Sequence, residues 1–143
     1  MMEHREIAVK CFNSTWDLID KKDRTEEEVL QMIHMAHASR YHWGEIGTPV
    51  NFTRGEWQIS RVYALAGMGE SALYHAKHAL KFCVDHNIGD FDLAFAYESL
   101  ARAYSVLDLQ TEKDVEIARA KDAAELISKK EDKDYFLSEL ASI

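Results

Sequence analysis

The sequence is poor in residues that interrupt helices. It contains one proline and six glycines in 143 residues, and these two residue types are the strongest breakers of regular helices. Long helices joined by short turns are therefore expected. The two cysteines, Cys11 and Cys83, stand too far apart to form a metal-binding pair. Each lies among apolar residues at helical spacing, which predicts buried, reduced thiols and a cytoplasmic protein.

Cationic charge and long apolar runs are also scarce. The net charge is −8, whereas a protein that binds nucleic acid through its phosphates needs an excess of cations. The same deficit argues against contact with anionic lipid. No apolar run approaches the ~20 residues that span a bilayer. None follows the charged N-terminus, so no signal peptide is predicted. We expect neither nucleic acid nor membrane as a partner.

Signatures of catalysis and of cofactor binding are missing as well. The sequence has no glycine-rich phosphate loop, no Cys-x-x-Cys, no His-Glu-x-x-His and no nucleophile elbow. The motif Gly67-x-Gly69 follows a helical segment rather than a strand, so it predicts a turn between helices and no dinucleotide site. The sequence therefore predicts a non-enzymatic protein with no catalytic residues and no cofactor.

Apolar residues recur three and four positions apart along most of the chain, which is the pattern of amphipathic helices. Charged connectors at 21–24 and 129–134, and glycine-containing loops at 44–47 and 67–69, separate the periodic segments. This pattern predicts an all-α fold in a single domain. Its expected parts are three antiparallel helical hairpins at 3–43, 49–87 and 90–128, and a short tail helix at 134–142 that covers the last hairpin.

Two helix starts carry specific signals. Thr25 followed by Glu28 predicts a capping box, and Pro49 is expected at the first position of the third helix. Gly55 lies inside that helix and costs about 1 kcal/mol relative to alanine. It therefore marks either a close contact with another helix or a later helix start.

Segment 56–80 has the spacing of small and aromatic residues that is typical of a tetratricopeptide repeat. The matching residues are Ile59, Ser60, Tyr63, Gly67, Ala72, Ala79 and Leu80. A second unit follows, with Tyr104 41 residues after Tyr63 and Ala120 44 residues after Ala76. The difference predicts a turn about three residues longer in the second unit. The chain thus resembles degenerate tetratricopeptide-repeat proteins, and the alternative is a plain helical bundle with alanine-rich seams.

The resemblance implies a right-handed superhelix whose first helices line a concave face that holds a partner peptide or helix. The positions that it places on this face are Arg54, Trp57, Arg61, Phe95, Glu98 and Arg102. Arginine beside tryptophan suits recognition of carboxylates, so the implied function is protein–protein interaction, with an acidic peptide as partner. The alternative is that Arg61 and Arg102 pair inside the protein and only join the repeats. The acidic candidates for such pairs are Glu56, Glu98 and Asp92.

Histidines provide an alternative function. His34 and His37 are three residues apart and share a helix face. With His42 and Glu45 nearby in sequence, they could supply ligands to a zinc or nickel ion or line a small-ligand site. The competing interpretation is that these side chains are partly exposed or hydrogen-bonded between helices.

Two further possibilities stay open. Tyr41, His42 and Trp43 could join Trp57 in an aromatic cluster, either as core or as the lining of a small-molecule pocket. In addition, a solenoid of three repeats is near the minimum length for stability, so its end faces could form a homodimer.

Overall fold

The structure is a computed structural model that describes residues 2–143. Within these residues it contains seven α-helices and no strand, which confirms the predicted all-α fold. The helices are α1 (His4–Ile19), α2 (Glu26–Ile46), α3 (Pro49–Leu65), α4 (Gly69–Asp85), α5 (Asp90–Val106), α6 (Gln110–Ala124) and α7 (Lys130–Leu140).

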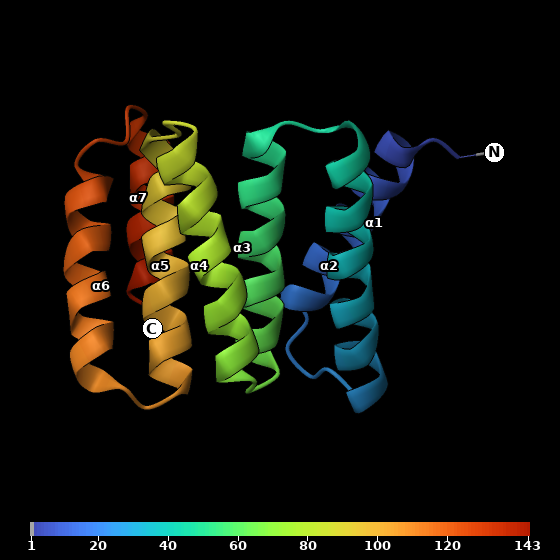
Figure 1. Cartoon of the computed structure of the whole chain (residues 1–143). Helices are drawn as coiled ribbons and strands as arrows, with labels where there is room; N and C mark the ends of the chain where they lie inside the picture. The colour runs from blue at the N-terminus through green and yellow to red at the C-terminus, as the bar shows by residue number, and fades with distance from the viewer. Residues whose placement is uncertain (1) are drawn as a thin grey trace.

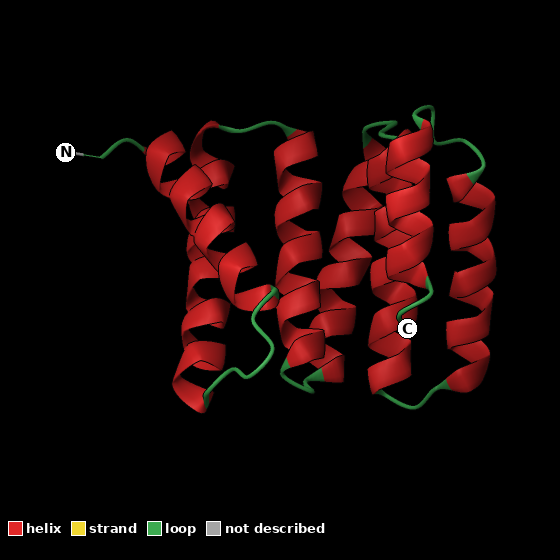
Figure 2. Cartoon of the chain, turned by 180° about the vertical axis from the view of Figure 1, so that it is seen from behind, coloured by secondary structure: helices red, strands yellow, loops and turns green. Residues whose placement is uncertain are grey.

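The helices pack as neighbouring hairpins, α1 with α2, α3 with α4 and α5 with α6 (Figure 1). In that view α1 lies behind α2, and α7 lies behind α5. From behind, in Figure 2, α1 and α7 lie on opposite sides of α3. The last helix packs against α5 and α6, so it covers the third hairpin as the sequence predicts. No described helix is both long enough and apolar enough to cross a membrane.

The capping signals are confirmed. The Thr25 hydroxyl accepts a hydrogen bond from the Glu28 N–H, and the Glu28 carboxylate accepts one from the Thr25 N–H. Pro49 is the first residue of α3. A Cβ atom at Gly55 would lie 2.8 Å from Cδ of Arg40, so this glycine marks a close contact between α2 and α3.

Two predicted connectors are wrong because they are helical. The segment 44–47 does not form a loop, since α2 continues through Gly44 to Ile46 and ends where the Gly47 N–H bonds the Trp43 carbonyl. A single glycine lowers helix stability without ending a helix.

The segment 129–134 is also mostly helical. Here α7 begins at Lys130, and Glu131 and Asp132 lie in its first turn, where acidic side chains stabilise the positive end of the helix dipole. The preceding helix, α6, ends at Ala124, four residues before the predicted end at Ser128.

The turns of the second and third hairpins are equal in length, so the longer turn predicted for the third hairpin is wrong. Three residues separate α3 from α4, and three separate α5 from α6. The middle residue of each turn has a positive φ, 76° at Gly67 and 58° at Asp108. The next residue donates its N–H to an equivalent tyrosine carbonyl, that of Tyr63 or Tyr104. Both turns therefore end their helices in the same way.

With equal turns, the 41-residue spacing continues into the second helices. Ala120 then corresponds to Ala79 rather than to Ala76, and Ala79 and Ala120 are both fully buried. The predicted alignment was displaced by nearly one helical turn, because alanines three residues apart lie close together on one helix face.

The last helix is firmly anchored. Phe136 of α7 is completely buried, and Leu140 lies one turn later in the same core cluster. Their neighbours in that cluster include Phe95 of α5 and Ile127 after α6. This packing fixes α7 beside α5, where it borders the cleft described next.

Candidate binding cleft

An open cleft with a volume of about 430 Å³ lies between α1, α3, α5 and α7. These four helices can be followed in Figure 2. Aromatic side chains dominate its lining, and we call it the aromatic cleft. Its lining residues are Phe12, Trp16, Thr53, Arg54, Trp57, Phe91, Asp92, Phe95, Asp132 and Tyr135.

The rings of the aromatic cleft contact one another. Trp16 stacks on Trp57 with ring centroids 5.5 Å apart, and Trp57 meets Phe95 edge-on at 5.4 Å. Phe95 in turn lies 4.6 Å from Phe91 and 6.0 Å from Tyr135 between centroids. Such spacings are those of favourable aromatic pairs. The rings thus form a continuous apolar surface from α1 to α7.

Two of the predicted partner-binding residues, Trp57 and Phe95, lie in this surface, whereas Trp16 was missed. Trp16, Trp57 and Glu98 are each 41 residues apart in the sequence and lie on α1, α3 and α5. The spacing that revealed the second repeat could therefore have identified Trp16. No comparable signal marks Tyr135, because its place in the cleft depends on where α7 packs.

Two of the three charged side chains that line the cleft are paired with each other, and the third is not. Arg54, the third predicted residue here, donates Nε and Nη2 to the two Asp92 oxygens at 2.9 and 3.1 Å. This bond to Asp92 raises the pKa of Arg54. In contrast, the Asp132 carboxylate on α7 has no hydrogen bond or ion pair with any of residues 2–143. Asp132 is therefore the one carboxylate of the lining that no described cation neutralises.

The other three predicted residues form a buried network next to the cleft. Glu98 is fully buried and accepts hydrogen bonds from Trp57 Nε1 at 2.8 Å and Arg102 Nε at 2.6 Å. Arg61 Nη1 lies 3.5 Å from the same carboxylate. The pairing of Arg61 and Arg102 inside the protein, considered as an alternative from the sequence, is therefore observed.

The same arginines attach α7 to the hairpins. Arg102 Nη2 donates to the Glu139 carbonyl and to the Ser142 hydroxyl, both at 3.0 Å. Arg61 Nη2 lies 3.7 Å from the Glu139 carboxylate. Burial and the neighbouring Arg102 charge lower the pKa of Arg61, although a guanidinium stays protonated in proteins. Only 12% of the Arg61 side chain is exposed, so little of it is accessible to a partner.

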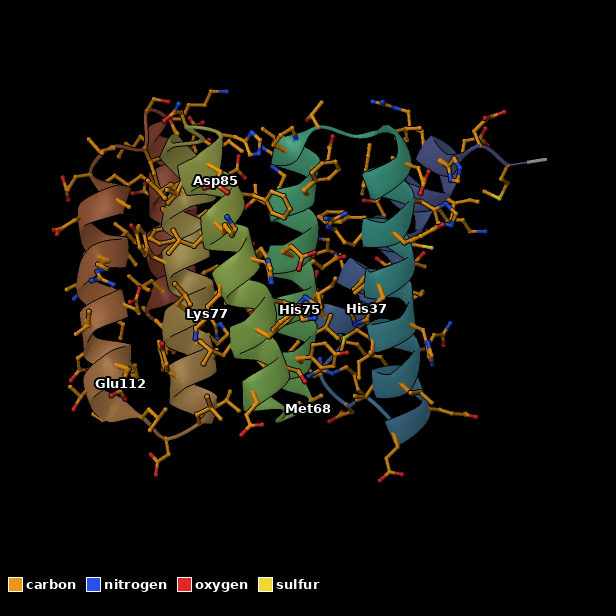
Figure 3. The ribbon with its side chains drawn as sticks, in the orientation of Figure 1. His37, Met68, His75, Lys77, Asp85 and Glu112 are labelled. Carbon is orange, nitrogen blue, oxygen red and sulfur yellow. The ribbon has the colours of Figure 1, made fainter. Side chains whose placement is uncertain are left out.

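His37 and His75 lie away from the cleft, where α2, α3 and α4 meet. Figure 3 marks His37 on α2 and His75 on α4, with ring centroids 5.4 Å apart. His37 Nε2 is hydrogen-bonded to the Tyr63 hydroxyl at 2.8 Å, and His75 Nδ1 to the Glu56 carboxylate at 2.8 Å. Arg40 Nε donates to the other Glu56 oxygen. Burial, with the positive potential of His75, lowers the pKa of His37.

The residues predicted for a metal or small-ligand site are not brought together. His34 and Glu45 are exposed, and His37 faces Tyr63. The ring of His42 instead approaches that of His4, with 2.7 Å between Nδ1 atoms. Among residues 2–143 no group of three or more histidine, cysteine, aspartate or glutamate side chains is arranged to hold a metal ion.

The aromatic cluster predicted from Tyr41, His42 and Trp43 does not include Trp57, although the rings of Tyr41 and His42 meet edge-on with 5.4 Å between centroids. The Trp43 ring lies 5.6 Å from the Arg5 guanidinium, and Tyr41 is exposed. Trp57 packs instead against Trp16 and Phe95.

No protein-family model, curated protein or solved structure matches this chain.

Proposed function

We propose that this chain is a non-enzymatic protein-interaction module, built as a tetratricopeptide-like right-handed superhelix, whose aromatic cleft holds a side chain of a partner protein. The three packed hairpins and the repeated turn support the architecture. Cys83 is buried, and Cys11, half-buried, is also a free thiol, which fits a cytoplasmic location.

The observation that carries the functional proposal is the aromatic cleft itself. Its volume of about 430 Å³ falls in the range of about 300–1,000 Å³ that is usual for ligand sites. Its walls come from four helices, so the cleft is held open by the fold. Tryptophan and tyrosine are enriched among the residues that contribute most to protein interfaces. A bulky side chain entering the cleft would bury apolar surface on several of these rings.

The arginine network changes the kind of partner that is proposed. Recognition of an acidic peptide requires guanidinium groups that are free to bind carboxylates. Arg102 is hydrogen-bonded to Glu98 and to α7, and Arg54 is hydrogen-bonded to Asp92. Arg61 forms ion pairs with Glu98 and Glu139, and only 12% of its side chain is exposed. We therefore assign binding to the aromatic side chains, and a structural role to Arg61, Glu98 and Arg102.

Peptides selected on the immobilised protein from a random synthetic library, which includes modified as well as standard side chains, test this proposal. Their affinities are measured by calorimetry for the wild type and for the variants Tyr135→Ala and Tyr74→Ala. Tyr135 lines the cleft and is 47% exposed, whereas Tyr74 on α4 is 60% exposed and lies outside the cleft. Each variant therefore removes one exposed tyrosine, and circular dichroism verifies that both stay folded.

The expected result is a loss of at least about fivefold for Tyr135→Ala, the size expected for an interface residue that contributes more than about 1 kcal/mol. Tyr74→Ala should leave the affinity unchanged. Equal affinities for all three proteins, or a library that yields no binding peptide, would refute the assignment of the cleft.

A further inference from the structure

We propose that the side chain held by the aromatic cleft is a cation, specifically the N-methylated ammonium group of a lysine on the partner protein. This inference rests on the proposed function and adds the chemistry of the bound group. It follows from three features of the cleft: its ring surfaces, its charge and its shortage of free hydrogen-bond acceptors.

The ring surfaces favour a cation. Six of the ten lining residues are aromatic, and two of these are tryptophans. The face of an aromatic ring carries negative potential and attracts ammonium groups, most strongly for tryptophan. Because Trp16 and Trp57 stack at 5.5 Å and continue into Phe95, a group in the cleft is close to several rings at once.

The charge of the cleft has the matching sign. Its charged lining residues are Arg54, Asp92 and Asp132, and the first two neutralise each other. Asp132 leaves one net negative charge. Burial raises the pKa of Tyr135, and the carboxylates of Glu139 and Asp20 raise it further against the effect of Arg61. An anionic group would therefore be repelled at this side of the cleft, whereas a cation is attracted.

The acceptors available in the cleft favour a methylated ammonium over an unmodified one. A lysine ammonium has three N–H donors to satisfy. Asp92 is occupied by Arg54, and the Thr53 hydroxyl donates to the Ala79 carbonyl and contacts Cys83. Among the carboxylates, only that of Asp132 is uncommitted. Methylation replaces N–H donors with apolar groups that contact rings without needing acceptors, so the desolvation cost is smaller.

Choline and 3,3-dimethylbutan-1-ol provide the matched probes, because they have the same shape and differ in charge. Binding to the full chain is followed by calorimetry and by the indole N–H signals of Trp16 and Trp57. Choline should bind about tenfold more tightly than the neutral alcohol, within the range of cation–π energies. The variant Asp132→Asn should weaken choline binding about threefold, as expected for a partly exposed charge pair. The control variant Asp134→Asn changes an exposed carboxylate of the same helix that does not line the cleft, and should have no effect.

A peptide arm then tests the source of the cation. A capped Gly-Lys-Gly peptide is compared with the same peptide carrying trimethyllysine, and the trimethylated form should bind more tightly than both the unmodified peptide and choline. Tighter binding of choline than of either peptide would overturn the partner-protein assignment in favour of a free small molecule.

Equal or tighter binding of the neutral alcohol would overturn the proposal that the cleft binds a cation. The cleft would then be an apolar binding site, and the proposed function would still stand. The proposal that the cleft binds a cation is also refuted if neither probe binds at millimolar concentration. In that case the library-selected peptides decide separately whether the cleft binds protein.

Discussion

Replacement of Glu98 by glutamine tests whether the buried arginine network holds the third hairpin and α7 together. Glu98 is the common acceptor for Trp57 and Arg102 and faces Arg61, and only 1% of its side chain is exposed. Glutamine keeps the shape of the side chain but removes its charge. The amide oxygen can still accept a hydrogen bond, but the NH₂ group cannot accept one from the N–H groups of the neighbouring arginines.

The expected cost follows from the charges left behind. Arg61 and Arg102, with 12% and 15% of their side chains exposed, would lose their shared carboxylate. Removing one partner of a buried ion pair destabilises a protein by about 3–5 kcal/mol. Glutamine can retain the bond from Trp57, so the lower end, about 3 kcal/mol, is expected. For a protein of this size that corresponds to a fall in Tm of about 6–12 °C.

The assay is urea denaturation followed by circular dichroism, with the slope of the transition confirming that only stability changes. Glu116→Gln is the matched control, since Glu116 is also a buried carboxylate but pairs only with Arg119, whose side chain is 58% exposed. An exposed partner contributes at most about 1 kcal/mol. If Glu98→Gln cost no more than this control, the network would not be what stabilises the packing of α7.

Two further predictions concern the contact between the first and second hairpins. Burial and His75 lower the pKa of His37 in the folded protein below its ordinary value. As pH falls below about 6.5, His37 is therefore protonated in the unfolded chain before it is protonated in the folded protein. Stability should therefore decrease as pH falls from about 6.5 toward the folded pKa, and His37→Gln should reduce that slope in denaturation midpoints measured between pH 8 and 5. Gly55→Ala should destabilise by about 1–2 kcal/mol despite its better helix propensity, because its Cβ would lie 2.8 Å from Arg40 Cδ. Gly89→Ala, with no atom within 4 Å of the added Cβ, should remain within about 0.5 kcal/mol of the wild type in the same thermal melts.

Local signals predicted the starts of α2 and α3, whereas the side-chain caps predicted at Asp90 or Asp92 for α5 and at Thr111 for α6 are not found. The Thr25 capping box and the start at Pro49 are both found. Predictions failed where a helix boundary depends on many weak contributions rather than on one capping residue. Gly44 lies within α2, and the charged residues after Lys129 start α7. Composition alone marks both segments as connectors, although neither contains a residue that prevents helix formation.

The candidate site could be predicted only in part, because a repeat pattern gives the face of a helix but not what packs against it. Trp57 and Phe95, both predicted to bind a partner, line the aromatic cleft. Arg61 and Arg102 share that face, yet α7 packs beside them and Glu98 binds both. Arg61 and Glu139, now 3.7 Å apart, are 78 residues apart in the sequence, and no local spacing relates them.

The position of α7 also determines what kind of partner the cleft admits. An open groove formed by α1, α3 and α5 would accept a whole helix or an extended peptide along its length. Here α7 packs on α5 and α6 through the buried Phe136, and its Asp132 and Tyr135 form one wall of the cleft while Phe12 and Trp16 of α1 form the opposite wall. A space bounded on both sides suits a single inserted side chain better than a continuous helix. Under the proposed function, affinity should therefore depend chiefly on one residue of the partner, with little contribution from the residues around it.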